Sequence, residues 1–505
     1  MSEQTGDAAK DDEKKGLPPI KTAGLIGGPV VFLLLMLGTG IEGMTPAAQA
    51  AAAVTLLMAI WWVTEAIPIY ATALVPIVLF PITGVLSVAE TTANYGHELI
   101  YLFLGGFLLA IAIQKWKLHR RIALTIVGLF GTEPTRLILG FMVATGFLSM
   151  WISNTASAMM MVPIGLAVIA QLTHMLRAQG SELDLRAGHF PFGMALMLGI
   201  AYAASIGGLA TIIGSPPNAI FVGYVSRIEG VEISFLQWML YGLPLSVVGL
   251  VGAWLYLTRI AHPVHTTAFP GLGDVIDDER KSLKPLKGPE ARVLIIFCVV
   301  AGLWILRGIL APVLDQIGLG GLNDTTIAVF GGLLLFLVPA KLEEKKFLLE
   351  WSDTADVPWG ILILFGGGLA LAAGIEESGL ATWLGDNLGL LEGAPLIAVL
   401  GALVLLVIFL TEVTSNTSTA SIFVPIVAIL ATVVGVHPYV LMITVVTAAS
   451  CAFMLPIATP PNAVVFASEY VTMRQMMKAG VWLNISFALL IVVAGYVWLP
   501  LAWGI

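Results

Sequence analysis

The sequence predicts an all-α polytopic membrane protein, and three observations support this fold class. Of the 505 residues, 58% are hydrophobic and only 11% are charged, whereas soluble domains carry about a quarter charged residues. A membrane helix needs roughly 20 apolar residues, and the chain supplies about a dozen such stretches. Four of the stretches are interrupted by polar residues in a pattern that occurs twice. The first two observations exclude a soluble fold, and the third indicates a duplicated, inverted-repeat transporter.

The chain begins with a polar segment, residues 1–21, which we expect to be a disordered cytoplasmic tail. It mixes acidic and basic residues with few apolar ones, a composition that buries too little surface to fold. It is too acidic for a signal peptide. The net charge of −8 and the lack of a basic stripe argue against nucleic-acid binding.

Nine apolar runs are expected to form ordinary membrane helices. They cover residues 23–40, 50–68, 71–88, 98–114, 236–258, 292–312, 324–340, 358–376 and 478–502. Basic residues cluster in the loops 115–121 and 259–292, so both loops are expected on the cytoplasmic side. The run 115–130 starts basic and becomes apolar, which favours a helix that lies along the membrane surface.

Two further apolar runs are each interrupted by the tripeptide Ser-Asn-Thr. The run 136–172 is broken at residues 153–155, and the run 396–433 is broken at residues 415–417. Each break leaves two arms that are short for a full membrane span. We therefore expect two re-entrant hairpins, each of which enters and leaves the membrane on one side.

Two more apolar runs are broken by the tripeptide Pro-Pro-Asn. The run 191–226 is broken at residues 214–218, and the run 438–472 is broken at residues 458–462. Non-helical backbone at membrane depth is tolerated only where it is buried in protein or faces water. The four breaks are therefore expected to line a binding site.

Both kinds of break recur in the same order, which indicates two homologous halves. The Ser-Asn-Thr elements are 262 residues apart, and Pro163 and Pro425 share this offset. Interrupted hydrophobic segments in corresponding positions are typical of inverted-repeat transporters, whose sites lie near the middle of the membrane. We expect residues 22–230 to form the first half, 231–340 to form connecting scaffold helices with a cytoplasmic loop, and 341–505 to form the second half.

The residues at the breaks suit an anion. Ser215 and Thr459 each precede a proline, as an N-cap precedes proline at the first helical position, and Asn154 and Asn416 are expected to cap the second hairpin arms. Four helix N-termini would converge, each with about half a positive charge and with N–H groups that suit carboxylate or sulfate oxygens. The inner turns contain no Lys, Arg or His. Positive charge must therefore arrive with the substrate.

Sodium is the expected cation, because unwound membrane helices offer carbonyl, hydroxyl and amide oxygens to it. One expected cage consists of Ser149, Ser153, Asn154 and the carbonyl of Gly214, and its partner consists of Thr411, Thr414, Asn416 and the carbonyl of Ala458. Glu65 and Glu412 also lie in apolar segments, where either structural pairing or tuning of the ion sites explains them. Arg307 is expected to snorkel from a helix end.

The paired Ser-Asn-Thr hairpins, each followed by a Pro-Pro-Asn break, resemble the divalent anion/sodium symporter family, which includes the INDY-type dicarboxylate transporters. The similarity covers nearly the whole chain beyond residue 20. It implies about 11 transmembrane helices plus two hairpins, and a homodimer in which each protomer moves a transport domain past a scaffold by an elevator motion. The expected location is a bacterial inner membrane, in contact with lipid.

The resemblance also assigns roles to residues. It implies that the two sodium sites use the cage residues given above. It implies that substrate oxygens meet Asn154, Thr155, Ser215, Ser415, Asn416, Thr417 and Thr459.

The expected function is sodium-coupled symport of C4-dicarboxylates such as succinate, malate and fumarate. A sodium-coupled symporter of sulfate or other inorganic anions and a sodium-independent dicarboxylate exchanger remain alternatives, because these contacts suit any compact dianion. An enzyme is not expected, since the breaks offer Ser and Thr without a neighbouring base. A channel fits less well, because paired hairpins that occlude a central site favour stepwise transport.

Overall fold

The computed structural model describes residues 18–505, except 39, 179, 181, 182, 265–279, 284, 317, 319, 342–344 and 388–391. Within this part the fold is helical apart from one short antiparallel pair, β1 (Pro339–Lys341) and β2 (Lys346–Phe347). The predicted all-α fold is therefore confirmed. Residues 1–17 of the predicted tail lie outside the described residues, and the first helix begins within the predicted tail, at Pro19.

The first group of helices precedes the first hairpin. It consists of α2 (Pro19–Leu37), α3 (Pro46–Thr64), α4 (Ile69–Thr72), α5 (Val75–Thr83), α6 (Val88–Ala93), the 3-10 turn η2 (Asn94–Gly96) and α7 (Glu98–Lys115). The expectation of a single membrane helix over 71–88 is wrong, because α4 and α5 divide this run. Pro76 is the second residue of α5, and a proline clashes with a helix that would continue into it from before.

The first hairpin and the first broken helix follow. The elements are α8 (Leu118–Leu129), α9 (Pro134–Ser149), α10 (Asn154–Ala178), α11 (Pro191–Gly208), the 3-10 turn η3 (Ile212–Gly214), α12 (Pro216–Glu229), α13 (Phe235–Tyr256) and the π-helical turn η4 (Leu257–Ala261). Lys117 is left-handed, with φ of 57°, and separates α7 from α8. At 12 residues α8 is too short to span a membrane.

The middle of the chain and the second half complete the fold. The elements are α15 (Pro289–Gln316), α16 (Asp324–Leu337), β1, β2, the 3-10 turn η5 (Trp351–Asp356), α17 (Trp359–Glu377), α18 (Leu380–Asn387), α19 (Leu396–Thr411), α20 (Asn416–Val434), α21 (Pro438–Ala449), α22 (Pro460–Phe466), α23 (Met473–Val493), the π-helical turn η7 (Ala494–Trp498) and α24 (Leu499–Trp503). Helices α8, α9 and α10 begin 262 residues before α18, α19 and α20. The offset found in the motifs therefore extends to whole helices.

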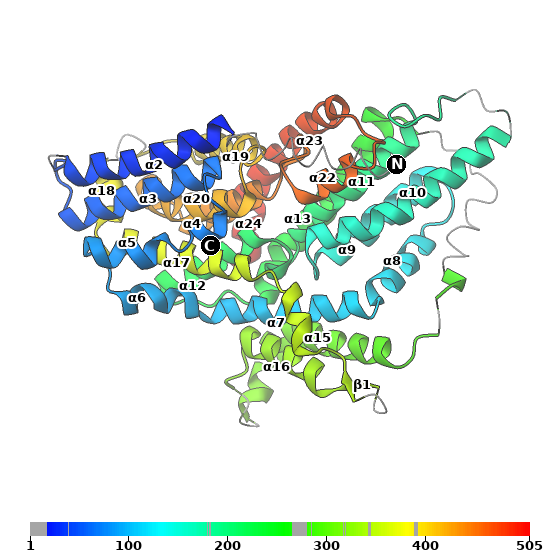
Figure 1. Cartoon of the computed structure of the whole chain (residues 1–505), viewed down its shortest axis with the longest axis horizontal. Helices are drawn as coiled ribbons and strands as arrows, with labels where there is room; N and C mark the ends of the chain where they lie inside the picture. The colour runs from blue at the N-terminus through cyan, green and yellow to red at the C-terminus, as the bar shows by residue number, and fades with distance from the viewer. Residues whose placement is uncertain are drawn as a thin grey trace, which may run out of the picture.

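The two hairpins approach the centre of the molecule from opposite ends. Figure 1 shows α9 and α10 toward the right of the view and α19 and α20 toward the left. Each hairpin packs against the broken helix of its own half, α10 against α11 and α20 against α21, and α12 of the first half also contacts α20 of the second. This arrangement is that of an inverted repeat.

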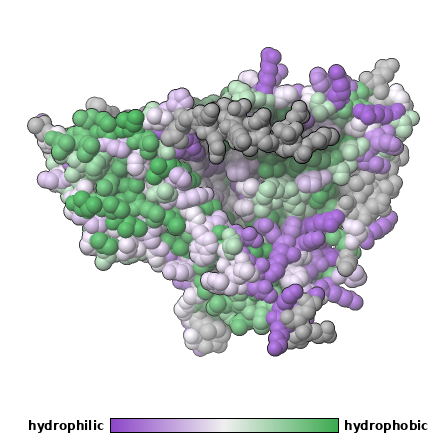
Figure 2. Space-filling view, viewed as in Figure 1, coloured by the Kyte–Doolittle hydropathy of each residue, from purple (hydrophilic) through white to green (hydrophobic). Residues whose placement is uncertain are grey.

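The described residues include ten helices that are long and apolar enough to cross a membrane. Shorter apolar helices include both first hairpin arms, α9 and α19. Figure 2 shows hydrophobic residues over the face formed by α2, α3 and α5, where exposed side chains such as Leu34 and Leu37 suit lipid contact. The expectation that both arms of each hairpin are short is wrong, because the second arms, α10 and α20, are among the ten long helices. The ten spans confirm a polytopic membrane protein.

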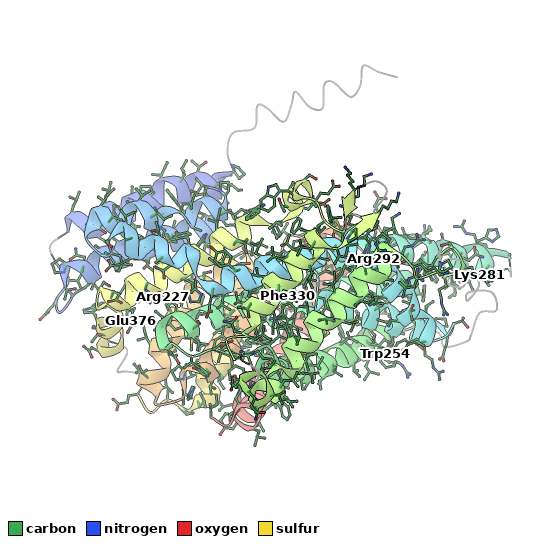
Figure 3. All side chains as sticks on the ribbon, turned by 90° about the horizontal axis from the view of Figure 1, so that it is seen from below. Arg227, Trp254, Lys281, Arg292, Phe330 and Glu376 are labelled. Carbon is green, nitrogen blue, oxygen red and sulfur yellow. The ribbon has the colours of Figure 1, made fainter. Side chains whose placement is uncertain are left out.

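The described basic residues of the two predicted cytoplasmic loops lie toward one end of the molecule. Arg121 of α8 forms an ion pair with Glu290 at the start of α15, with Nε 2.7 Å from Oε1. Figure 3 shows Lys281 and Arg292 toward the same end. By the positive-inside rule, the cytoplasmic location of this end stays a prediction.

Gly105 allows α7 to lie against α16. A Cβ atom at this position would lie 2.4 Å from the carbonyl carbon and oxygen of Ala328. Because backbone atoms cannot move aside cheaply, we expect Gly105→Ala to lower the melting temperature of the purified protein, with an unfolding penalty of about 1–3 kcal/mol. Gly308→Ala on α15 is the control, since nothing lies within 4 Å there. Equal melting temperatures for the two variants would contradict this account of the contact.

Candidate functional site

The tip of the first hairpin brings Ser149 and Asn154 against the first broken helix. The Ser149 hydroxyl donates to the Ala204 carbonyl oxygen at 2.6 Å and lies 2.5 Å from Asn154 Oδ1. With the amide group turned over, Asn154 Nδ2 donates to the Ser149 hydroxyl at 2.5 Å and to the carbonyl oxygens of Gly214 at 3.1 Å and Ala204 at 3.2 Å. The Asn154 amide, the Ser149 hydroxyl and two main-chain carbonyls therefore converge.

The orientation of the Asn154 amide decides whether this first oxygen cluster has enough protons. With Nδ2 turned inward, the amide donates to its neighbours. With Oδ1 turned inward, as sodium requires, the cluster holds more acceptors than protons. The Ser149 hydroxyl supplies one proton, while the two carbonyls and the amide oxygen supply none. Ser149 and Gly214 are buried, where unpaired acceptors are costly. A hard cation satisfies such a set, because carbonyl, hydroxyl and amide oxygens are its usual ligands. The residues present therefore fit the expected sodium ion.

The second hairpin repeats the arrangement with a threonine in place of the serine. The Thr411 hydroxyl lies 2.7 Å from Asn416 Oδ1 and donates to the Ala449 carbonyl oxygen at 2.9 Å. Thr411 and Asn416 stand 262 residues after Ser149 and Asn154. A second oxygen cluster therefore forms at the corresponding place in the second half.

Three of the expected sodium ligands have other recorded contacts. The Ser153 hydroxyl accepts a hydrogen bond from the N–H of Ala156 at 3.2 Å. The Thr414 hydroxyl bonds to Leu410 O at 2.9 Å and to Thr419 Oγ1 at 2.7 Å. The N–H of Ala458 donates to Leu455 O. Their roles as ligands stay predictions.

The expected helix caps are partly wrong. Helix α10 begins at Asn154 itself, so Ser153 caps it, and the Asn154 amide turns to the Ser149 hydroxyl instead. Asn416 likewise is the first residue of α20 and faces Thr411. Ser215 precedes α12 but makes no capping hydrogen bond, whereas Thr459 accepts one from the N–H of Asn462 at 3.4 Å.

The expected substrate ligands lie at the starts of four helices. Asn154 and Thr155 begin α10, and Ser215 precedes α12. Ser415 precedes α20, Asn416 and Thr417 begin it, and Thr459 precedes α22. The Ser215 hydroxyl lies 3.0 Å from that of Ser450, in the second break. This contact joins the broken helices of the two halves at one point.

Sequence reasoning missed the role of the asparagine in each Pro-Pro-Asn element. Asn218 Nδ2 donates to the carbonyl oxygens of Gly208 and Thr211 at 3.0 and 2.8 Å. Asn462 Nδ2 donates in the same way to Ala452 and Leu455 at 3.2 and 3.0 Å. Each asparagine thus holds the non-helical backbone of its own break. The recurrence of the asparagine in both motifs was the available signal.

The charged residues within apolar segments have structural partners. Glu412 is 3% exposed and accepts hydrogen bonds from backbone N–H groups of the second break. Glu65 is half exposed, and its carboxylate lies 3.7 Å from Lys21 Nζ. Arg307 pairs with buried Asp324 at 3.0 Å and with Glu232 at 2.9 Å, and its expected snorkelling to the membrane surface stays a prediction.

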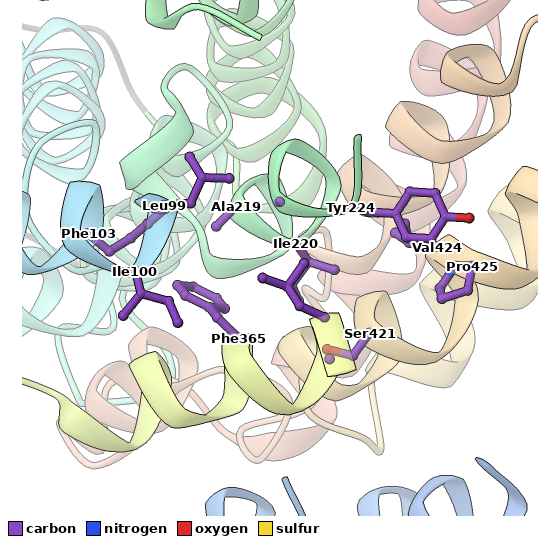
Figure 4. A pocket seen from close by; sticks show the side chains of 13 residues that line it. Leu99, Ile100, Phe103, Ala219, Ile220, Tyr224, Phe365, Ser421, Val424 and Pro425 are labelled. Atoms are coloured by element: carbon purple, nitrogen blue, oxygen red, sulfur yellow. The ribbon is translucent and has the colours of Figure 1, made fainter. Parts of the chain in front are cut away.

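A small apolar cavity lies beside the first break, where its lining includes Ala219. Figure 4 shows its lining, which includes Phe103 of α7, Ile220 of α12, Phe365 of α17 and Ser421 of α20. Its volume of about 20 Å³ leaves room for roughly one water molecule. It contains none of the expected site residues, so we do not assign it to the substrate.

Comparison with solved structures supports the fold. The YdaH transporter of Alcanivorax borkumensis aligns over 81% of this chain and 87% of its own, with a TM-score of 0.56 and 15% identity. MtrF of Neisseria gonorrhoeae, described as one of a class of antimetabolite efflux pumps, aligns over 94% and 95%, with a TM-score of 0.53 and 12% identity. At these identities the likeness concerns the fold alone.

Comparison of sequences is more specific. The sodium-dependent dicarboxylate transporter SdcS of Staphylococcus saprophyticus is 45% identical over 98% of this chain and 94% of its own length. SdcS of Staphylococcus aureus is 44% identical over 98% and 95%. The family model described as the sodium:sulfate symporter transmembrane region matches residues 22–504. The chain is therefore an integral, multi-pass protein of the plasma membrane and belongs to the sodium:sulfate symporter family, the divalent anion/sodium symporters that its motifs resemble.

Proposed function

We propose that this protein is a secondary transporter that carries C4-dicarboxylates such as succinate, malate and fumarate together with sodium ions. The paired oxygen clusters at the two hairpin tips carry the proposal, because each combines a hydroxyl, an amide oxygen and main-chain carbonyls from a broken helix. The name of the SdcS relatives supports both the ion and the substrate class.

Sodium binds at the two hairpin tips in this proposal. The first site consists of Ser149, Ser153, Asn154 and Gly214, and the second consists of Thr411, Thr414, Asn416 and Ala458. The geometry around Ser149 and Asn154 supports the first site, and the matching pair Thr411 and Asn416 supports the second.

The dianion binds between the tips. Its oxygens meet Asn154, Thr155, Ser215, Ser415, Asn416, Thr417 and Thr459. Helices α10, α12 and α20 each have 14 residues or more and begin here, so their N-termini add partial positive charge. The contact between Ser215 and Ser450 supports a single site, because it joins the two halves.

Coupling follows from shared residues. Asn154 and Asn416 belong to both the sodium and the substrate sets, so sodium that orders these amides raises the affinity for the dianion, and the dianion must raise the affinity for sodium equally. The loaded transport domain then moves past the scaffold of a homodimer by an elevator motion. No side chain performs covalent chemistry in this cycle, so the protein is not an enzyme.

An inorganic dianion such as sulfate is the second candidate substrate, because the family is described as sodium:sulfate symporters. The hydroxyl, amide and N–H donors of the site suit sulfate oxygens as well as carboxylates. A dicarboxylate exchanger that needs no sodium is the third candidate. Competition and ion replacement distinguish the three.

Transport by purified protein in liposomes tests the proposal. We expect labelled succinate uptake under an inward sodium gradient and none when potassium replaces sodium. If three or more sodium ions accompany each dianion, an inside-negative potential accelerates uptake, because each net charge gains about 2.3 kcal/mol per 100 mV. Excess sulfate should compete poorly. Succinate uptake that does not depend on sodium but requires dicarboxylate inside the liposomes would establish an exchanger. Sodium-dependent uptake of sulfate without uptake of succinate would establish the inorganic-anion symporter.

A further inference from the structure

The second break contains backbone that needs hydrogen-bond partners. Helix α21 ends at Ala449 and α22 begins at Pro460, so residues 450–459 lie outside both helices. Phe453 is fully buried in this stretch. Unpaired N–H groups cost several kcal/mol at membrane depth. A partner must therefore hold this part of the chain.

Glu412 is that partner. Its Oε1 accepts from the N–H groups of Phe453 at 2.8 Å and Met454 at 2.9 Å, and its Oε2 accepts from the N–H of Leu455 at 3.0 Å. Asn484 Nδ2 of α23 donates to Oε1 at 2.7 Å. All four partners are donors, which suits an ionised carboxylate, the form that only accepts.

Glu412 is connected to the second sodium cluster on both sides. Thr411 precedes it in the chain, and the Thr411 hydroxyl contacts Asn416 and the Ala449 carbonyl. Glu412 binds the N–H of Leu455. The carbonyl oxygen of Leu455 in turn accepts a hydrogen bond from the N–H of Ala458 at 3.1 Å. The carboxylate therefore fixes the turn that carries the Ala458 carbonyl.

The first half bridges the same two positions without a carboxylate. Met150 corresponds to Glu412 by the hairpin offset, and Thr211 corresponds to Leu455 by the offset of the Pro-Pro-Asn elements. There the Thr211 hydroxyl donates to the Met150 carbonyl oxygen at 2.6 Å. Both halves thus tie the hairpin to the break, but only the second half uses a buried carboxylate.

We propose that Glu412 is the positioning residue of the second sodium site, and that the first sodium site does not depend on it. This inference rests on the proposed function, because it takes the Thr411 and Asn416 cluster to bind sodium. Glu412 itself touches backbone N–H groups, so it acts through the turn that it holds. Partners that orient metal ligands in this way typically change metal affinity by about 10–100-fold when removed.

The variant Glu412→Gln tests the proposal. It keeps the shape of the side chain but places an amide NH₂ group, which is a donor, against backbone N–H donors. We expect the half-saturating sodium concentration for succinate uptake to rise by about 10–100-fold, while the maximal rate at saturating sodium stays within about twofold. The sodium-dependent rise in melting temperature of the detergent-solubilised protein should shift to higher sodium by the same factor. Glu412→Asp, which keeps the charge, should restore part of the affinity.

Asp324→Asn is the matched control. Asp324 is a second buried carboxylate, 4% exposed, and it is distant in sequence from both hairpin tips. It accepts a hydrogen bond from the N–H of Phe235 and forms an ion pair with Arg307. We expect this variant to lower the melting temperature without changing the sodium concentration that half-saturates uptake. A loss of stability alone therefore does not mimic the predicted effect of Glu412→Gln.

Two outcomes would overturn the inference. One is a folded Glu412→Gln protein whose half-saturating sodium concentration equals that of the wild type. The other is a fall in maximal rate with unchanged sodium dependence. If Glu412→Gln fails to fold, the variant Asn484→Leu tests the inference instead, because it removes one hydrogen-bond donor to Glu412. We expect it to raise the half-saturating sodium concentration, by a smaller factor than Glu412→Gln would. Wild-type uptake without sodium dependence would instead overturn the proposed function.

Discussion

Asn154→Ala is expected to reduce sodium-dependent succinate uptake by at least about 100-fold. The Asn154 amide lies 2.5 Å from the Ser149 hydroxyl and 3.1 Å from the Gly214 carbonyl oxygen. Alanine removes an oxygen from the sodium cage and a donor from the substrate site. Because hydrogen bonds to charged groups contribute about 1.5–3 kcal/mol each, losing two such contacts accounts for this magnitude.

Asn323→Ala is the control for this change. Asn323 caps α16, accepting from the N–H of Thr326 at 2.8 Å, and takes no part in the hairpins. Losing that cap costs about 1 kcal/mol of stability but should leave sodium-dependent uptake intact. Full sodium-dependent uptake by a folded Asn154→Ala protein would contradict the assignment of the first sodium site. Asn416→Ala should behave as Asn154→Ala does.

Gly208→Ala should cause the second large loss. A Cβ atom on Gly208 would lie 2.7 Å from Asn154 Oδ1 and 2.7 Å from the Gly214 carbonyl oxygen, and both atoms belong to the first oxygen cluster. One methyl group would therefore displace the cluster without altering any proposed ligand. We expect the half-saturating sodium concentration to rise at least about tenfold, the size of effect that disturbed support of a metal site produces.

The corresponding residue in the second half provides the comparison. Ala452 occupies that position, since Asn462 holds its carbonyl as Asn218 holds that of Gly208. The second break thus accommodates a Cβ where the first does not. Ala452→Gly and Gly302→Ala, the latter with nothing within 4 Å, should leave sodium affinity unchanged. A normal sodium dependence in Gly208→Ala would show that the first cluster does not bind sodium.

Much of the fold was predictable, because membrane spans and motif repeats are local features of a sequence. The hairpins, the broken helices and the offset between Asn154 and Asn416 all follow from apolar runs and their interruptions. The division of the run 71–88 into α4 and α5 was missed, although Pro76 marks it. Hydropathy alone does not show where a proline ends a helix within an apolar run.

The site was predictable only as far as its motifs extend. The pairs Ser149 with Asn154 and Thr411 with Asn416 were expected as members of the two sodium cages, and the structure brings each pair together. The sequence did not indicate that Glu412 would reach backbone 41 to 43 residues away. Such contacts depend on how the hairpin packs on the broken helix, which no local pattern specifies.

Simultaneous flux of labelled sodium and labelled succinate in the same proteoliposomes tests the central claim most directly. The two oxygen clusters predict that a succinate gradient drives sodium inward, that a sodium gradient drives succinate inward, and that Asn154→Ala abolishes both fluxes. Succinate movement with no accompanying sodium flux would contradict the claim that these clusters hold the coupling ions.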